Sequence, residues 1–229
     1  MDRHVPIIRF FLYNTGMPIT TIFFDLDDTL YPASSGVWKM IKARMTVYMH
    51  DRIGIPWEDI PTLREKYFSE YGTTLRGLQA HYPVDMDDYL SFVHDIPLEE
   101  HLRPDEKLRA MFEALPAHKL IFTNADSGHA LRTVTALGVQ SCFEAIVDIR
   151  AMDPYCKPMR QAFEIAMRVA GEQDPHRCVL VDDLASTTRA AQDFGFYSIL
   201  FGQDGNHAKN ESNARLSQLM DLPAVLKGL

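Results

Sequence analysis

The chain has 229 residues, of which 46% are hydrophobic, and this is enough to bury a full core of one α/β domain that carries an insertion. Its formal net charge of -8 argues against nucleic acid as a partner, because binding to a phosphate backbone needs clustered lysine and arginine. No apolar run reaches the length of a membrane span, and the three scattered cysteines form no zinc or disulfide pattern, so we expect no membrane partner and a reducing, cytoplasmic location.

The first core element is predicted to follow a short extension, residues 1–16. Residues 7–12 are apolar but interrupted by a charge, and no small-residue cleavage site follows them, so a signal peptide is not expected. Met17 directly precedes the first predicted strand and is an alternative start of the functional chain. The sequence does not choose between these two interpretations of residues 1–16.

Residues 21–24 are β-branched or aromatic, which is typical of a buried central strand of a parallel sheet. The strand ends at Asp25 and Asp27, at the edge where open α/β sheets bind their ligands. Two carboxylates this close repel each other unless a cation or a proton lies between them. A bound Mg²⁺ would keep Asp25 ionised as a nucleophile, while Asp27 could serve as acid and base.

Residues 31–103 contain no convincing parallel strand and are predicted to form an inserted α-helical cap. Apolar residues recur at helical spacing over 37–48 and 63–71, and acidic residues open another helix over 86–94. Such a cap would close over the site, exclude water and select the leaving group.

Residues 17–30 and 104–229 are predicted to form the catalytic core, a doubly wound parallel sheet with crossover helices. The stretch 202–213 is polar and is interpreted as a loop. In chain order the expected core elements after the cap are a helix 104–115, a strand 120–123, a helix 127–137, a strand 145–147, a helix 158–169, a strand from Cys178, a helix 186–194 and a strand 197–201.

Two further strand ends and one helix start carry matching chemistry. The second strand ends at Thr123 and Asn124, whose hydroxyl and backbone N–H could hold a phosphate oxygen. Lys157 stands before Pro158, which suits a first helical turn, and could meet an anion there. The strand from Cys178 ends at Asp182 and Asp183, a second carboxylate pair.

These four motifs, in this order, resemble those of the haloacid dehalogenase superfamily of phosphatases, which use Mg²⁺. The resemblance implies that Asp25 attacks phosphorus, and that Asp27 protonates the leaving oxygen and gives its backbone carbonyl to the metal. It implies that Thr123 and Lys157 hold the phosphoryl group, that Asp183 ligates the metal, and that Asp182 lies behind it or acts through water. Which acid of this pair touches the ion is left open.

A finer resemblance, from Phe23 to the chain end, points to the pyrimidine 5'-nucleotidase branch. It depends on Asp25–Pro32, on a cap segment Tyr71–Leu78, on Phe122–Ala125 with His129, on the motif around Lys157, and on a closing Asp221-Leu222-Pro223. Leu184 and Thr187 depart from the branch, where a Ser and then an Asn commonly follow the acidic pair; we interpret this as tuning around the metal.

The resemblance predicts a Mg²⁺-dependent phosphomonoesterase for nucleoside 5'-monophosphates, with UMP or CMP preferred. Another small phosphate ester of sugar or vitamin-precursor type, a phosphomutase and a non-catalytic relative remain alternatives. Asn124 and Arg76 are candidate substrate contacts, although Arg76 could equally tie cap helices together. His129 and Arg132 are interpreted as surface residues of their helix, and Tyr31 as a packing residue.

Overall fold

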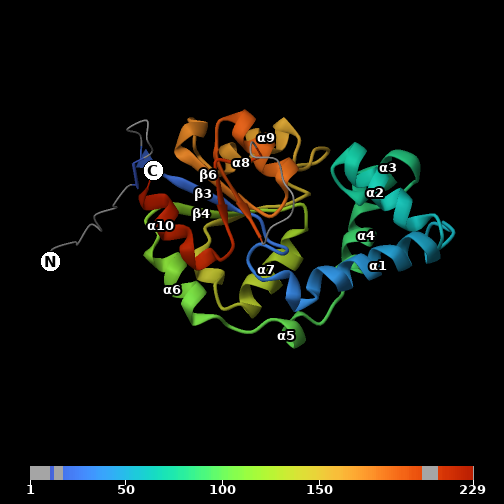
Figure 1. The fold of residues 1–229 in the computed structure, drawn as a ribbon. Helices are drawn as coiled ribbons and strands as arrows, with labels where there is room; N and C mark the ends of the chain where they lie inside the picture. Colours follow the sequence, from blue (N-terminus) through green and yellow to red (C-terminus); the bar gives the residue numbers. More distant parts are fainter. Residues whose placement is uncertain (1–10, 13–17, 203–210, 229) are drawn as a thin grey trace.

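The computed structural model describes residues 11–12, 18–202 and 211–228. Its core is a six-stranded parallel sheet with the strand order β5-β4-β3-β6-β7-β8. This confirms the predicted doubly wound α/β fold (Figure 1). The strands are β3 (Thr21–Phe24), β4 (His118–Phe122), β5 (Ala145–Val147), β6 (Cys178–Asp182), β7 (Tyr197–Phe201) and β8 (Ala214–Leu216).

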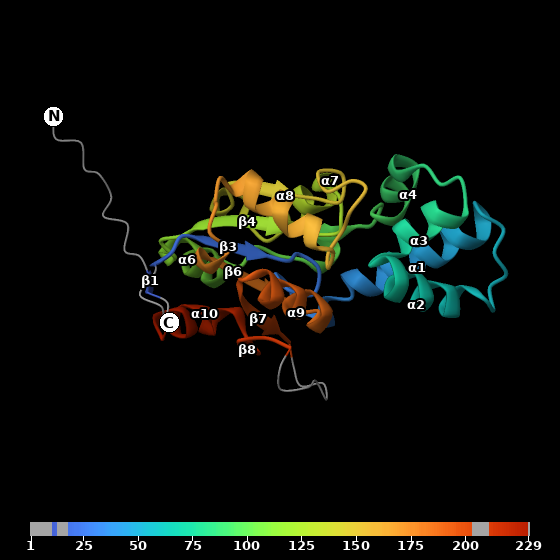
Figure 2. The same ribbon diagram turned by 90° about the horizontal axis from the view of Figure 1, so that it is seen from above.

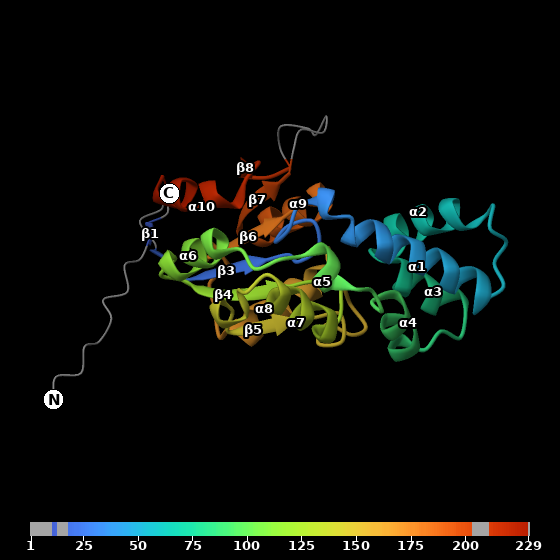
Figure 3. The same cartoon turned by 90° about the horizontal axis from the view of Figure 1, so that it is seen from below.

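Helices cover both faces of this sheet (Figures 1 and 3). The alternation of side chains along β3 shows why: Phe23 stacks on Phe196 at one face, while Phe24 packs edge-on against Phe112 at the other. One face carries α8 (Arg160–Ala170) and α9 (Ala185–Phe194), and the other carries α6 (Glu106–Ala114), α7 (Ser127–Ala136) and α10 (Leu222–Lys227).

Four helices form a cap at the end of the sheet toward which the strands point (Figure 2). Their buried side chains make a cluster of their own, which includes Tyr48, Leu78 and Tyr89. Gly77 is required at one crossing, because a Cβ there would lie 2.3 Å from Tyr67. The cap helices are α1 (Val37–Asp51), α2 (Ile60–Tyr71), α3 (Thr74–His81), which the sequence did not predict, and α4 (Met86–Val93).

The chain returns from the cap through a short helix, α5 (Leu98–His101). Ile96, Leu98 and Leu102 pack into the main core cluster rather than into the cap. The packing thus changes from the cap cluster to the main core cluster before residue 103. The domain limits at residues 31 and 103 stay a prediction.

Three local features differ from the sequence expectations or extend them. Helix α8 begins at Arg160, two residues after Pro158. Strand β8 was not predicted, while residues 203–210 of the expected loop lie outside the described residues. Most of the extension 1–16 also lies outside them; its β1 (Phe11–Leu12) pairs antiparallel with β2 (Pro18–Ile19). No described helix is long and apolar enough to cross a membrane.

Candidate active site

The carboxyl ends of β3, β4 and β6 meet beside the cap, where the described residues line a cavity of about 520 Å³. Phe24 pairs with Ile121 on one side and Val181 on the other, so the residues that follow these strands lie at one level. The core side of the cavity contains most of the predicted site residues, namely Asp25, Asp27, Thr123, Asn124, Lys157 and Asp183. Asp182 and Arg76 are not among the residues that line it.

Lys157 lies between two carboxylates at the base of the site. Its Nζ is 2.7 Å from Asp25 Oδ1 and 2.7 Å from Asp182 Oδ2, and all three residues are buried. Burial alone would lower the Lys157 pKa, but Asp182 and Asp25 raise it above the ordinary value. Burial raises the pKa of Asp25, helped by repulsion from Asp182, whereas Lys157 opposes that rise. Lys157 therefore favours the ionised form of Asp25.

Asp27 is held by two side chains that the sequence analysis did not connect to it. His129 Nε2 lies 2.8 Å from Asp27 Oδ1, and the hydroxyl of Tyr31 donates to the same oxygen. Burial would raise the Asp27 pKa, but His129 and Tyr31 bring it below the ordinary value. The interpretation of His129 as a surface residue was wrong: it is 1% exposed, because its helix turns this side chain into the site. Tyr31 is likewise more than a packing residue.

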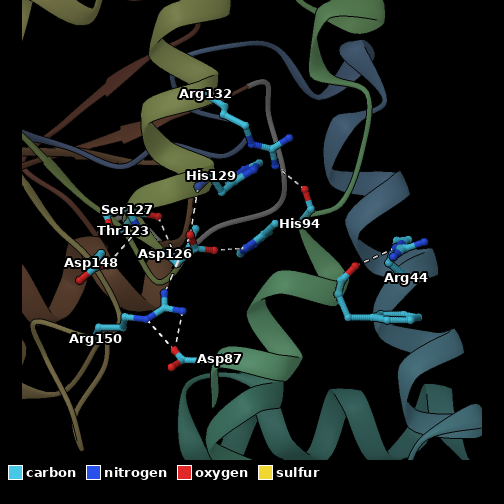
Figure 4. A network of polar contacts seen from close by, with 12 residues as sticks. Arg44, Asp87, His94, Thr123, Asp126, Ser127, His129, Arg132, Asp148 and Arg150 are labelled. Carbon is cyan, nitrogen blue, oxygen red and sulfur yellow. Dashed lines mark hydrogen bonds and ion pairs between the residues drawn. The ribbon is translucent and has the colours of Figure 1, made fainter. Parts of the chain in front are cut away.

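His129 in turn stacks on a histidine at the end of the cap (Figure 4). The rings of His94 and His129 lie 4.3 Å apart and 14° from parallel. His94 Nδ1 bonds to Asp126, which also caps α7 by accepting from the backbone N–H of His129. Burial lowers the pKa of His94, and Asp126 only partly offsets this. One chain of contacts thus links Asp27 to the cap–core junction.

Two arginines tie the same end of the cap to the core (Figure 4). Arg132 of α7 donates to the backbone oxygens of His94 and Ile96, which corrects its interpretation as a plain surface residue. Arg150 Nη2 lies 2.7 Å from Asp87 of α4. The bonds of Arg132 hold residues 94–96 against the helix that carries His129, and Arg150 joins α4 to the loop that follows β5.

Thr123 and Asn124 occupy the end of β4. Thr123 is 1% exposed, and its hydroxyl accepts from the backbone N–H of Ala125. The Asn124 side chain brackets the backbone of Lys157: Oδ1 accepts from Lys157 N at 2.9 Å, and Nδ2 donates to Lys157 O at 3.0 Å. Asn124 therefore positions the lysine, with both ends of its amide already bonded.

Arg76 does not reach the cavity. Its guanidinium donates to Asp153 at 2.6 Å and to the backbone oxygens of Ile149 and Tyr155 at 3.2 and 3.0 Å. Arg76 is 8% exposed, and Gln79 accepts a further bond at 2.9 Å. This geometry contradicts its expected role as a substrate contact and makes Arg76 a tie between the cap and the core loop at 149–155.

The family of haloacid dehalogenase-like hydrolases matches residues 19–195 of this chain. The chain belongs to this family. Over 192 residues the chain is 30% identical to Phosphate metabolism protein 8 of Saccharomyces cerevisiae. The aligned segment covers 78% of this chain and 60% of that relative. The hydrolase therefore spans less than two thirds of the length of this curated relative.

Solved structures share the fold of this haloacid dehalogenase-like hydrolase at low identity. YfnB from Bacillus subtilis, bound to magnesium, gives a TM-score of 0.62 at 16% identity, covering 90% of this chain and 98% of that one. A HAD phosphatase from Thermococcus onnurineus gives 0.60 at 17% identity, with 91% and 98% covered. L-2-haloacid dehalogenase from Xanthobacter autotrophicus, with chloropropionic acid covalently bound, gives 0.59 at 15% identity, with 92% and 99% covered.

Haloacid dehalogenase-like hydrolases generally use Mg²⁺, and the carboxylates of this chain fit such an ion. Within the described residues, Asp183 makes no hydrogen bond or ion pair, and Asp28 Oδ1 is buried without a partner. Burial, then repulsion from Asp25 and Asp182, raises the Asp183 pKa. An added cation would relieve this repulsion.

The donor set is sparse, which suits Mg²⁺ in particular. The described part of the chain holds no cluster of three or more His, Cys, Asp or Glu side chains that could bind a metal. Asp25 and Asp183 with a backbone carbonyl would leave half of the octahedral coordination positions to water and substrate, and Mg²⁺ in proteins commonly keeps several waters. Both carboxylate oxygens of Asp182 already have partners: Oδ2 accepts from Lys157 Nζ, and Oδ1 accepts from Leu184 N at 2.9 Å. Asp183 is therefore the better candidate for direct contact with the metal.

Proposed function

We propose that this hydrolase is a Mg²⁺-dependent phosphomonoesterase that acts on nucleoside 5'-monophosphates, with a preference for pyrimidine bases, through an aspartyl-phosphate intermediate. The observation that carries the proposal is the placement of two differently held carboxylates on one loop. Asp25 is bonded to a buried lysine, whereas Asp27 is bonded to His129 and Tyr31. Two neighbouring acids held in different environments can take different roles.

Asp25 would attack phosphorus and form a covalent ester with the phosphoryl group, which divides hydrolysis into two easier steps. Lys157 opposes the rise in the Asp25 pKa that burial causes, so it favours the ionised form before attack, and it offsets negative charge as a phosphoryl group arrives. Thr123, buried at the end of β4, would hold a phosphoryl oxygen. Bound Mg²⁺ would supply further positive charge, so that one anion can approach another.

Asp27 would give a proton to the leaving oxygen and then take one from the attacking water. Its pKa lies below the ordinary value in the free protein, so its carboxylate is ionised there. A phosphate ester brings negative charge close to Asp27, which raises its pKa and favours the protonated form. Displacement of a halide needs no such donor, because halide departs as a stable anion; Asp27 and its two partners therefore favour phosphate esters over haloacids.

The nucleotide preference depends on the cap. The segment Tyr71–Leu78, which resembles the pyrimidine 5'-nucleotidase branch, brings residues 72–75 to the cavity wall. The volume of about 520 Å³ lies within the range of small-molecule sites and leaves room for a leaving group beside the phosphate. Trp38, Phe68 and Leu90 give this wall an apolar surface suited to a flat ring.

A panel of phosphate esters tests this proposal. Purified protein with Mg²⁺ would be given UMP, CMP, AMP, GMP, a sugar phosphate, a vitamin-precursor phosphate and phenyl phosphate, and released phosphate would be measured. We expect the highest kcat/KM for UMP or CMP. A higher value for a sugar or vitamin-precursor phosphate would replace the nucleotide assignment, and transfer of phosphate to a second hydroxyl instead of water would indicate a mutase.

A further inference from the structure

The cap wall of the cavity contains two polar atoms that lack a partner. Tyr89 of α4 and Arg64 of α2 both line the cavity. Within the described residues, Tyr89 Oη and Arg64 Nε are buried and make no hydrogen bond. Tyr89 is only 2% exposed, so water does not compensate its hydroxyl. Most buried polar groups in proteins are satisfied, so two unsatisfied ones on the wall of one cavity are candidates for pairing with a ligand that enters it.

Both groups pack against α1 beside the cavity, Arg64 through Lys42 and Thr46, and Tyr89 through the ring of Tyr48. Burial raises the pKa of Tyr89 while the positive charge of Arg64 opposes that rise, and burial lowers the pKa of Arg64. The other end of the Arg64 guanidinium is anchored to α1, because Nη1 donates to the backbone oxygen of Lys42 at 3.3 Å and to Thr46 Oγ1 at 3.4 Å. This anchoring holds the Nε edge of Arg64 in place without using it.

The chemistry of the pair defines what it would accept. A guanidinium only donates hydrogen bonds, and a phenol hydroxyl can donate one. Two such donors suit an oxygen that accepts two hydrogen bonds, such as a carbonyl. The surrounding wall is apolar, with Phe68 and Leu90 nearby on the same helices, so the group that carries the oxygen should be a flat ring rather than a second charged group.

We propose that Tyr89 Oη and Arg64 Nε form a leaving-group subsite that binds a ring carbonyl oxygen. For a nucleotide substrate this oxygen is O2, which uracil and cytosine share and which adenine lacks. In that form the inference rests on the proposed function. The subsite itself requires only a leaving group with a carbonyl acceptor, and it supplies the base selection for which Arg76 is wrongly placed.

Tyr48 provides a matched control for Tyr89. Its ring packs edge-on against Tyr89 at 5.0 Å, but its hydroxyl donates to Asp88 Oδ2 at 2.8 Å and it does not line the cavity. Tyr48→Phe and Tyr89→Phe each remove one hydroxyl from the same cluster. Tyr48→Phe should lower the melting temperature, because a formed bond is lost, whereas Tyr89→Phe should not.

The test compares kcat/KM for UMP, CMP, AMP and ribose 5-phosphate in the wild type, Tyr89→Phe, Arg64→Lys, the double variant and Tyr48→Phe. Tyr89→Phe should lose roughly threefold to tenfold more on UMP and CMP than on AMP or ribose 5-phosphate. Arg64→Lys should act in the same direction, and the double variant should lose less than the product of the two. Tyr48→Phe should change all four substrates by one factor. Equal losses across substrates in Tyr89→Phe and Arg64→Lys would overturn the subsite.

A second substrate pair separates this inference from the proposed function. 2-Naphthyl phosphate and 4-methylumbelliferyl phosphate both have a fused two-ring leaving group, and only the second carries a ring carbonyl. The ratio of variant to wild-type kcat/KM cancels their different reactivities. If the wild type does not hydrolyse nucleotides, the proposed function fails. A selective loss on the 4-methylumbelliferyl ester in Tyr89→Phe would still support the subsite, and an equal loss on both esters would overturn it. If the protein turns over no ester at all, thermal stabilisation by uridine that disappears in Tyr89→Phe supports the subsite, and no stabilisation of the wild type overturns it.

Discussion

The two walls of the cavity differ in the kind of polar group that is left unpaired. On the core wall, Lys157 bridges Asp25 and Asp182 and Asp27 is bonded by His129 and Tyr31, while the unpaired groups are carboxylates, among them Asp28. On the cap wall the surface is largely apolar, and Arg64 Nε and Tyr89 Oη have no partner within the described residues. The core wall is organised before substrate arrives, as phosphoryl chemistry requires, whereas the cap wall keeps donors for the leaving group.

The largest expected effect comes from the charge of Asp25 on the core wall. Asp25→Asn keeps the shape and a hydrogen-bond acceptor for Lys157 but removes the nucleophile, so kcat should fall roughly a thousandfold or more, with little change in melting temperature. Steady-state phosphate release measures it. Asp193→Asn, on the exposed side of α9, is the control and should retain activity. More than about a tenth of wild-type turnover in Asp25→Asn would remove Asp25 from its assigned role.

Metal removal should abolish turnover and should also be visible without substrate. Mg²⁺ binds only the folded protein, so at a hundred times Kd it should stabilise it by about 2.7 kcal/mol in thermal unfolding. Asp183→Asn should lose most of this shift, whereas Asp193→Asn should keep it. Full activity in chelator, or no Mg²⁺-dependent shift in the wild type, would contradict the metal assignment.

The same variant gives a pH dependence with a definite sign. The folded-state pKa of Asp183 is raised to about 9 in the metal-free protein, so the cost of ionising Asp183 is absent below the ordinary aspartate pKa and grows as pH rises from there toward the raised value. In chelator, Asp183→Asn should therefore melt above the wild type, by more at pH 8 than at pH 5. A gap that stays constant or narrows with rising pH would show that Asp183 is not an uncompensated carboxylate.

An intermediate effect is expected where the core wall meets the cap–core junction. His129→Ala removes the 2.8 Å contact that orients Asp27, and misplacing a proton donor lowers kcat roughly tenfold to a hundredfold, with KM changed much less. His118→Gln, at an exposed histidine of β4, is the control. A rise in KM at unchanged kcat would instead make His129 a substrate-binding residue.

The smallest effect on activity is expected at Arg76, where the cap is tied to the core. Arg76→Ala leaves the buried oxygen of Ile149 and the part-buried oxygen of Tyr155 without this donor, while half-exposed Asp153 can turn to water, so unfolding should become easier by roughly 1–3 kcal/mol. Activity on UMP and AMP should fall by one common factor. Arg160→Ala, which removes an exposed helix-surface pair, is the control. A loss confined to pyrimidine nucleotides would restore Arg76 as a substrate contact.

The sequence predicted the core wall well because strand ends are local signals. An apolar run followed by Asp25, Thr123 or Asp183 specifies both a strand and the edge at which its last side chain lies. The doubly wound fold followed from the alternation of such runs with helices. Lys157 was also identified from its motif, although its contacts with Asp25 and Asp182 depend on a packing that one segment cannot show.

The remaining parts of the site come from contacts between distant segments. His129 was assigned to a surface because helical spacing alone does not tell which side of α7 faces Asp27, 102 residues earlier. Arg76 was ambiguous because its partners at Ile149 and Tyr155 belong to a core loop. A His or Arg near a motif was the only signal in the sequence, and such a residue type alone does not separate positioning from substrate binding.

The central claim is that Asp25 carries the phosphoryl group during turnover, and acid quenching tests it most directly. Enzyme mixed with its best phosphate ester and Mg²⁺ would be quenched in acid within the first turnover, digested and analysed by mass spectrometry. We predict the added mass of one phosphoryl group on the peptide that contains Asp25, at Asp25 itself, and its absence in Asp25→Asn. Phosphate release with no phosphorylated peptide, or with the phosphoryl group on another residue, would contradict the account.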